Sequence, residues 1–278
     1  MPLNGASGRP EDPMPTQITW DKRIQRAEEL LERNTSTAEL MAFYLHVLTL
    51  QQQMSQTLAS QATSESAEAA SLLEQLDVDL ALRWMPALLK LAQKKGPAKL
   101  AQEAARIGAA AEAEQRQQLL AFLDEKAGSY APSSFFAWVL FQTQAQSLAC
   151  RRQMPSNYSA ALCPLCGSRS QLAVLRPEGD GGKRHLACSL CLAEWEYRRI
   201  ICPVCEEVDP LKLPYYSPED PIAVRVEACD TCKAYQKSFD LTVDGLIVPD
   251  VDEIATVALD LWAAEHGYHK IRLNLLGF

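Results

Sequence analysis

Eight of the nine cysteines in this chain of 278 residues stand in four Cys-x-x-Cys pairs, and these pairs constrain the fold more than any other feature. Spacers of 21, 10 and 23 residues separate the pairs. A Cys-x-x-Cys turn can place two thiolates on one tetrahedral ion, and two such turns complete a closed site of four sulfurs. The pattern therefore predicts two metal sites, whose ligands are Cys163, Cys166, Cys188, Cys191, Cys202, Cys205, Cys229 and Cys232.

An internal repeat indicates how the four pairs combine. The first repeat contains CPLCGS, a β-type run and ACSLCLAEWEY. The second contains CPVCEE, another β-type run and ACDTCKAYQKS, and its two cysteine pairs follow those of the first at offsets of 39 and 41 residues. The repeat favours one site from the first two pairs and one from the last two, although an interleaved arrangement stays open. Each repeat has about 30 residues and is too short to bury a core of its own, so we expect metal binding to fold it.

The chemistry of the predicted sites has alternatives. Redox-active Cys-x-x-Cys motifs usually occur singly beside a βαβ pattern, which is absent from this sequence, and a disulfide framework conflicts with a reducing compartment. Zinc and iron both suit four thiolates in a tetrahedron. A closed shell leaves no open coordination position for hydrolysis. Because the sequence also contains no recognisable catalytic triad, carboxylate pair or phosphate-binding loop, we expect that the protein is not an enzyme.

The first half of the chain has a helical pattern. Residues 1–20 lack an apolar core and are expected to be a flexible tail, whereas residues 21–155 predict an all-α bundle of five to seven helices. Within the bundle, residues 98–127 predict one long helix. Residues 135–153 are apolar on both sides and predict the central helix, in which Cys150 is expected to be a buried thiol.

After Pro155 the sequence changes to Pro, Gly, Cys and short β-type runs. It predicts a first metal-binding unit at 156–200 and a second at 201–278, the second ending in a helix over 252–266. The predicted fold class is therefore multidomain, α plus small β. An N-terminal all-α bundle precedes two tandem zinc-ribbon-like units and a C-terminal helix.

Charge and hydropathy exclude two classes of partner. The chain has a net charge of −8, and residues 163–278 carry 12 basic against 18 acidic side chains. With eight thiolates and two divalent ions, this segment would reach about −10, the wrong sign for binding nucleic acid. The longest apolar runs are too short and too interrupted for membrane insertion, and the amino terminus lacks the core of a signal peptide. We therefore expect a cytoplasmic protein.

The cysteine-rich half resembles the formate dehydrogenase accessory protein family, often called FdhE. The resemblance covers residues 163–278 well and the helical half only in length and character. The matching segments are CPLCGS at 163, the run from His185 to Arg199, CPVC at 202, Tyr215-Tyr216-Ser217, the run 227–237, residues 252–260 and Glu265-His-Gly-Tyr268. The resemblance implies two rubredoxin-like units that bind iron. It also implies a cytoplasmic maturation factor that binds the catalytic subunit of respiratory formate dehydrogenases before their export.

Two residues in the ten-residue spacer are candidate partner contacts, Trp195 and Arg199. The alternative for Trp195 is a packing role over the metal turn. Arg198 and Arg199 point to opposite faces of a strand, and only Arg199 matches the family pattern. The leading hypothesis is a chaperone-like accessory factor with two metal ions, iron favoured by the resemblance and zinc compatible. The alternatives are an iron redox protein that delivers electrons during cofactor activation and, third, a nucleic-acid-binding ribbon; a homodimer is also compatible with the sequence.

Overall fold

The computed structural model describes residues 18–33, 35–61, 71–124, 134–179, 181–218 and 223–278. Of the tail expected at 1–20, residues 1–17 lie outside this range, and the first helix begins at Trp20. In the described part of the chain, no helix combines the length and the hydropathy that a membrane span requires.

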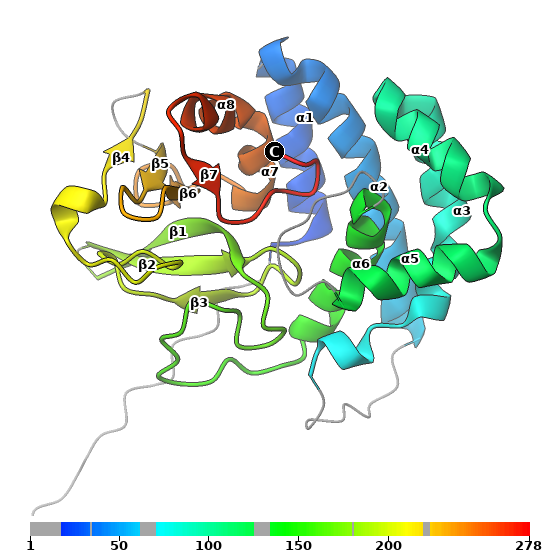
Figure 1. Ribbon diagram of the computed structural model, residues 1–278, viewed down its shortest axis with the longest axis horizontal. Coiled ribbons are helices and arrows are strands. Elements are labelled where there is room, and N and C mark those ends of the chain that lie inside the picture. The colour runs from blue at the N-terminus through cyan, green and yellow to red at the C-terminus, as the bar shows by residue number, and fades with distance from the viewer. Residues whose placement is uncertain (1–17, 34, 62–70, 125–133, 180, 219–222) are drawn as a thin grey trace, which may run out of the picture.

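Helices form the N-terminal part, which confirms the predicted all-α bundle (Figure 1). α6 (Ser134–Ala149) is its central helix, because 13 of its 16 residues are buried and it contacts three other helices. The continuous apolar character of this helix explains its position, since it can bury every side. The other helices are α1 (Trp20–Arg33), α2 (Ala38–Gln61), α3 (Val78–Lys95), α4 (Ala98–Ala109) and α5 (Glu112–Asp124).

The predicted single helix over 98–127 was wrong, because the chain turns between α4 and α5. Ala110 is extended, with ψ of 152°. The side-chain amide of Gln115 donates to the carbonyls of Ile107 and Ala110, at 3.0 and 3.3 Å. These hydrogen bonds satisfy carbonyl groups at the end of α4, and Gly108 in its last turn is the sequence signal for this end.

Strands from both cysteine repeats form one mixed sheet with the order β3-β2-β1-β6-β5-β4, with β7 also paired to β6. β1 and β6 run parallel, with Leu172 opposite Lys237. The units expected at 156–200 and 201–278 therefore share backbone hydrogen bonds. The strands are β1 (Ser170–Glu178), β2 (Gly181–Cys188), β3 (Glu194–Glu196), β4 (Tyr215–Tyr216), β5 (Val224–Ala228), β6 (Ala234–Asp240) and β7 (His269–Lys270).

The helix expected over 252–266 is also divided, into α7 (Pro249–Ala255) and α8 (Val257–Glu265). The division lies at Thr256, with φ and ψ of −102° and 27°. Lys237 is fully buried, and its ammonium group donates to the carbonyls of Glu253 and Thr256, at 2.6 and 3.3 Å. A buried lysine from the sheet thus donates hydrogen bonds to the carbonyl groups at the break. Because this lysine is distant in the sequence, the local sequence of the helix does not predict the break.

The C-terminal helices also connect the sheet to the bundle. α7 contacts α1, α2 and β1, and in Figure 1 it lies between the sheet and α1. Arg23 and Arg26 of α1 form ion pairs with Asp250 and Asp252, at 2.8 and 2.6 Å. These four side chains are largely buried, so the helical and cysteine-rich halves pack as one body.

Candidate metal centres

The structure brings the eight paired cysteines together in two groups. The four Sγ atoms of each group lie within 4.8 Å of one another. This is the grouping that the internal repeat favours, and the interleaved alternative does not occur. We call Cys163, Cys166, Cys188 and Cys191 the first cluster, and Cys202, Cys205, Cys229 and Cys232 the second cluster.

The spacing of the sulfurs fits a tetrahedral metal ion. Metal–sulfur bonds of about 2.3 Å place the sulfurs of a tetrahedron about 3.8 Å apart. In the first cluster the Sγ–Sγ distances include 3.3, 3.6 and 3.9 Å, and in the second 3.6 and 3.7 Å. None of the described cysteines is in a disulfide. Four soft thiolate donors fit zinc and iron equally well.

All four cysteine pairs are held by the same backbone turn. The residue after each pair has a positive φ: 70° at Gly167, 54° at Leu192, 61° at Glu206 and 60° at Lys233. In three of the turns its N–H donates to the carbonyl of the first cysteine, at 2.8 to 3.0 Å. A left-handed conformation costs about 1–2 kcal/mol for a residue other than glycine. Leu192, Glu206 and Lys233 therefore each destabilise the folded chain by about this amount when they adopt the turn.

Backbone N–H groups point at the sulfurs inside these turns. The N–H groups of Leu190 and Cys191 donate to Sγ of Cys188, at 3.3 and 3.4 Å. In the second cluster, the N–H of Val204 donates to Sγ of Cys202, at 3.4 Å. Such donors stabilise the charged thiolate over the neutral thiol. In both clusters, the backbone N–H groups therefore favour the thiolate form in which cysteine binds a metal ion.

The thiols of the first cluster need a cation to ionise together. Burial raises the pKa of the Cys188 thiol, and hydrogen bonds within the cluster raise that of Cys191. Hydrogen bonds from the other three cysteines instead lower the pKa of Cys166. The pKa values of these three thiols are thus shifted in opposite directions. A divalent ion supplies the positive charge that four thiolates require.

The first cluster is part of the main hydrophobic core. Its four cysteines expose between 0% and 4% of their surface and belong to the same core cluster as α6. The indole N–H of Trp138 and the amide of Gln142, both on α6, donate to the carbonyl of Ser189, at 3.1 and 3.3 Å. Helix α6 thus holds the turn between Cys188 and Cys191 directly.

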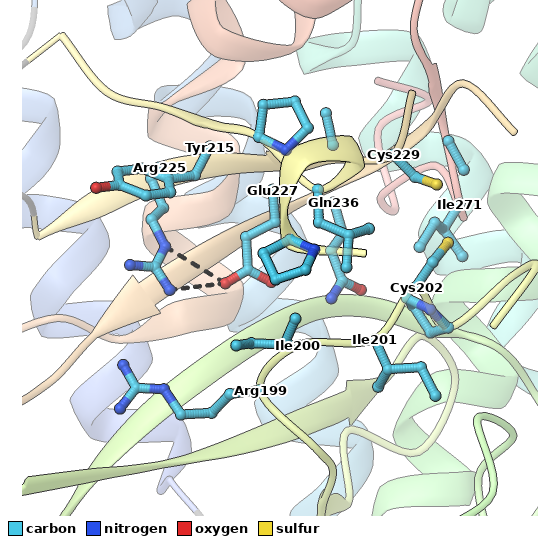
Figure 2. Close-up of a pocket in the computed structure, with 16 residues that line it drawn as sticks. Arg199, Ile200, Ile201, Cys202, Tyr215, Arg225, Glu227, Cys229, Gln236 and Ile271 are labelled. Carbon is cyan, nitrogen blue, oxygen red and sulfur yellow. Dashed lines mark hydrogen bonds and ion pairs between the residues drawn. The ribbon is translucent and has the colours of Figure 1, made fainter. Parts of the chain in front are cut away.

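The second cluster lies at the surface, at one end of a cleft. Cys205 is exposed and Cys232 is partly exposed. The cleft has a volume of about 570 Å³, and its walls are the segment 199–203 and one face of β5 and β6. Figure 2 shows Cys202 and Cys229 at one end and Arg199, Arg225 and Tyr215 at the other.

A carboxylate in this cleft links the two repeats. Glu227 on β5 forms ion pairs with Arg184 of β2 and with Arg225, at 2.8 and 2.9 Å. Burial opposes ionisation of Glu227, but the charges and hydrogen bonds of the two arginines outweigh it and lower its pKa to about 2. Glu227 was not predicted to be a site residue. Its signal is the alternation of Arg225 and Glu227, which places both on one face of a strand.

The two candidate partner contacts have different environments. Trp195 exposes only 3% of its surface, and its indole N–H donates to the carbonyl of Ala160 at 3.0 Å. Trp195 therefore packs in the core, and it offers no ring face to a partner in this conformation. Arg199 is exposed and lines the cleft. The predicted burial of Cys150 was wrong, because α6 ends at Ala149 and Cys150 is exposed.

Two family models match adjacent parts of the chain. Residues 162–199 match "FdhE, central domain", and residues 200–276 match "FdhE, C-terminal domain". A protein FdhE homolog of Aquifex aeolicus is 39% identical over 117 residues, which are 42% of this chain and 41% of the relative. One of Pseudomonas aeruginosa is 40% identical over 125 residues, 42% of this chain and 40% of the relative. The sequence matches thus span about two fifths of these relatives.

The likeness in structure extends over the helical half as well. The crystal structure of the FdhE protein from Pseudomonas aeruginosa superposes with a TM-score of 0.72 at 26% sequence identity. The match covers 95% of this chain and 99% of that one. The bundle and the sheet are therefore arranged alike in both proteins, although the sequences of the helical parts have diverged more.

Proposed function

We propose that the chain is a chaperone-like accessory factor for the assembly of formate dehydrogenase, because residues 162–276 match two FdhE family models and the fold matches that of an FdhE protein. In this role it binds the catalytic subunit in the cytoplasm before export and catalyses no reaction itself. The observation that carries the proposal is the pair of four-sulfur clusters on one sheet, docked on a helical bundle. Closed four-thiolate sites with this geometry hold structure, as a binding protein requires.

Two metal ions are part of this proposal, one in each cluster. The family resemblance favours iron, and the donor set accepts zinc as well. In either case the ion folds the four-cysteine turns, and the residues around the turns form the surface that a partner contacts. The first cluster connects the sheet to α6, so metal binding there also fixes how the bundle and the sheet sit together.

Direct binding to the catalytic subunit tests the proposal. The full chain, purified without oxygen, would be immobilised and exposed to the purified catalytic subunit of a formate dehydrogenase from the same organism. We expect binding that is lost when Cys205 and Cys232 are both replaced by serine. Cys150→Ser is the matched control, because Cys150 is an exposed cysteine outside both clusters. Absence of binding by the unmodified, metal-loaded chain would refute the proposal.

A second candidate function is electron transfer through iron in the second cluster. It is favoured by the exposure of Cys205, since a partly solvent-exposed iron site is accessible to a partner. An iron-loaded protein in this role would be reduced and reoxidised by one electron, with a matching change in its visible absorption. If the protein purified from its native host is colourless and holds only zinc, electron transfer is excluded.

A further inference from the structure

The cleft beside the second cluster lies on the face of β5 and β6 that carries Arg225, Glu227 and Gln236. α7 and α8 lie on the other face, where Lys237 of β6 reaches Glu253 and Asp260. Residues on the cleft face of β5 and β6 are Arg225, Glu227 and Gln236, and Figure 2 shows them in a row opposite the segment 199–202. Residues of the segment 210–215 and Ile271 complete the lining. The cleft is therefore an opening in the packing between the two repeats.

One end of the cleft is positively charged. Glu227 is shared by the guanidinium groups of Arg184 and Arg225, so this group of three keeps one net positive charge. Arg199 adds a second positive charge. Among the described residues it has no carboxylate partner, and it donates only a long hydrogen bond of 3.4 Å to the carbonyl of Gly182. This end of the cleft therefore keeps two net positive charges in a chain of net charge −8, and it favours an anionic group.

The floor of the cleft has an unmet hydrogen-bond donor. Gln236 exposes 1% of its surface, and its side-chain carbonyl accepts from the hydroxyl of Ser170 at 3.1 Å. Its amide nitrogen has no acceptor among the described residues. A buried donor without a partner is unfavourable, so a carbonyl oxygen brought within its reach is a favourable addition.

The rest of the cleft and its rim are apolar. The lining includes Ile201, Leu213 and Ile271, together with three prolines. Five large apolar side chains from the segment 200–215 are exposed, and two of them, Ile200 and Tyr215, line the cleft. They are Ile200 (53% exposed), Val204 (36%), Val208 (50%), Leu211 (89%) and Tyr215 (58%). Exposed apolar side chains gathered around a polar-ended cleft are typical of a surface that binds another protein.

From these features we propose that the cleft binds an extended segment of the catalytic subunit that carries a large apolar side chain and a nearby carboxylate. The apolar side chain fills the space between Ile201 and Leu213, and the carboxylate pairs with Arg199 and Arg225. A backbone carbonyl of the segment accepts from Gln236. A protein segment fits better than a small acid, because a small acid would leave the apolar rim uncovered. The assignment rests on the proposed function and names its contact surface.

Charge and apolar contact can be tested separately with two matched pairs of variants. Arg199→Glu changes a cleft arginine, and Arg198→Glu makes the same change at its exposed neighbour outside the cleft. Ile200→Glu changes an exposed cleft residue, and Leu246→Glu is the matched change at a residue 69% exposed and outside the cleft. All four side chains are exposed, so each variant is expected to fold and to bind metal as the unmodified chain does.

The experiment measures binding of each metal-loaded, full-length variant to the intact catalytic subunit and to short overlapping peptides that cover its sequence. Arg199→Glu and Ile200→Glu should each weaken binding about tenfold or more, and the two control variants should bind normally. The captured peptides should share an acidic and a large apolar residue. Replacing the acidic residue by its amide should weaken peptide binding about tenfold for the unmodified chain and little for Arg199→Glu.

The outcomes separate the two proposals. If the unmodified chain binds the catalytic subunit and both cleft variants bind it equally well, the cleft assignment is wrong and the proposed function stands. The same conclusion follows if the captured peptides have no acidic residue. If the unmodified chain binds neither the subunit nor any peptide, the proposed function fails and the cleft assignment fails with it.

Discussion

The first cluster lies inside the protein and the second at its surface, although both are built from the same backbone turn. The cysteines of the first cluster are all buried and contact α6 through Ser189. In the second cluster Cys205 is exposed, and the cluster borders a cleft. A repeated sequence motif thus fixes local ligand geometry, whereas neighbouring elements decide whether the site supports the core or a binding surface.

The largest difference is expected when one cysteine of each cluster is replaced. Cys188→Ser should remove the first metal and disrupt the core, because metal binding in such sites contributes on the order of 10–16 kcal/mol, which is comparable to the whole stability of a typical domain. Cys232→Ser should remove the second metal and leave the helical signal intact. Metal content and far-ultraviolet circular dichroism measure both effects. Equal loss of helix in the two variants would show that the clusters are not independent.

A smaller effect is expected at Glu227, which links the two repeats. Its pKa of about 2 lies below the value of about 4.3 for a free glutamate, so the folded state prefers the ionised form. The stabilisation, about 3 kcal/mol, is complete above about pH 5 and is lost as the pH falls toward 2. Glu227→Gln should therefore be less stable at pH 7 by about this amount.

The difference between the unmodified chain and Glu227→Gln should shrink steadily below pH 5. Denaturant unfolding at several pH values measures it, and because acid releases metal from both proteins, only their difference is informative. A difference that is the same at pH 7 and pH 3 would mean that the carboxylate charge does not couple the repeats.

A chelator should remove the metal ions of the two clusters at different rates. The second cluster is exposed, so its metal can be reached by small local openings, whereas the first requires the core to open. We expect a strong chelator to remove one metal per chain at least roughly tenfold faster than the other, which corresponds to about 1.4 kcal/mol in opening free energy. Mass spectrometry of alkylated cysteines identifies the cluster that is emptied. If the metal of the first cluster were released before that of the second, the first cluster would be the more accessible one, contrary to this prediction.

The smallest expected effects come from the left-handed residues of the turns. Gly167→Ala should destabilise the first cluster by about 1 kcal/mol, because φ is 70° and an added Cβ meets nothing within 4 Å that could compensate. Glu206→Gly at the exposed second turn should instead stabilise it by roughly 0.5 kcal/mol, after the greater freedom of glycine in the unfolded chain is subtracted. Thermal unfolding of the metal-loaded variants measures both. If the two substitutions changed the unfolding temperature in the same direction, backbone strain would not explain the difference between these positions.

The sequence was sufficient for features that depend on local pattern. The repeat of CPLC and CPVC indicated which cysteine pairs combine, because ligand spacing is a local property of the chain. The apolar character of 135–153 on both sides identified the central helix. The all-α character of the first half was visible in the same way.

Features that depend on contacts between distant segments were not predictable. The parallel pairing of β1 with β6 joins residues about 65 positions apart, and no turn signal marks it. The break at Thr256 depends on Lys237, which lies on a strand of the sheet. The sequence left two roles open for Trp195, a packing residue and a partner contact, because a tryptophan beside a metal turn suits both. Only its burial in the folded protein distinguishes them.

The ion pairs between α1 and α7 have a consequence for the time course of synthesis. Arg26 and Asp252 are separated by 226 residues, so α1 is synthesised well before the aspartates with which it pairs. At about 5–20 residues per second, this interval lasts on the order of 10 s or more. During that interval Arg23 and Arg26 have neither Asp250 nor Asp252 to neutralise them. Completion of the body that holds both clusters therefore requires synthesis of the segment around Asp250 and Asp252.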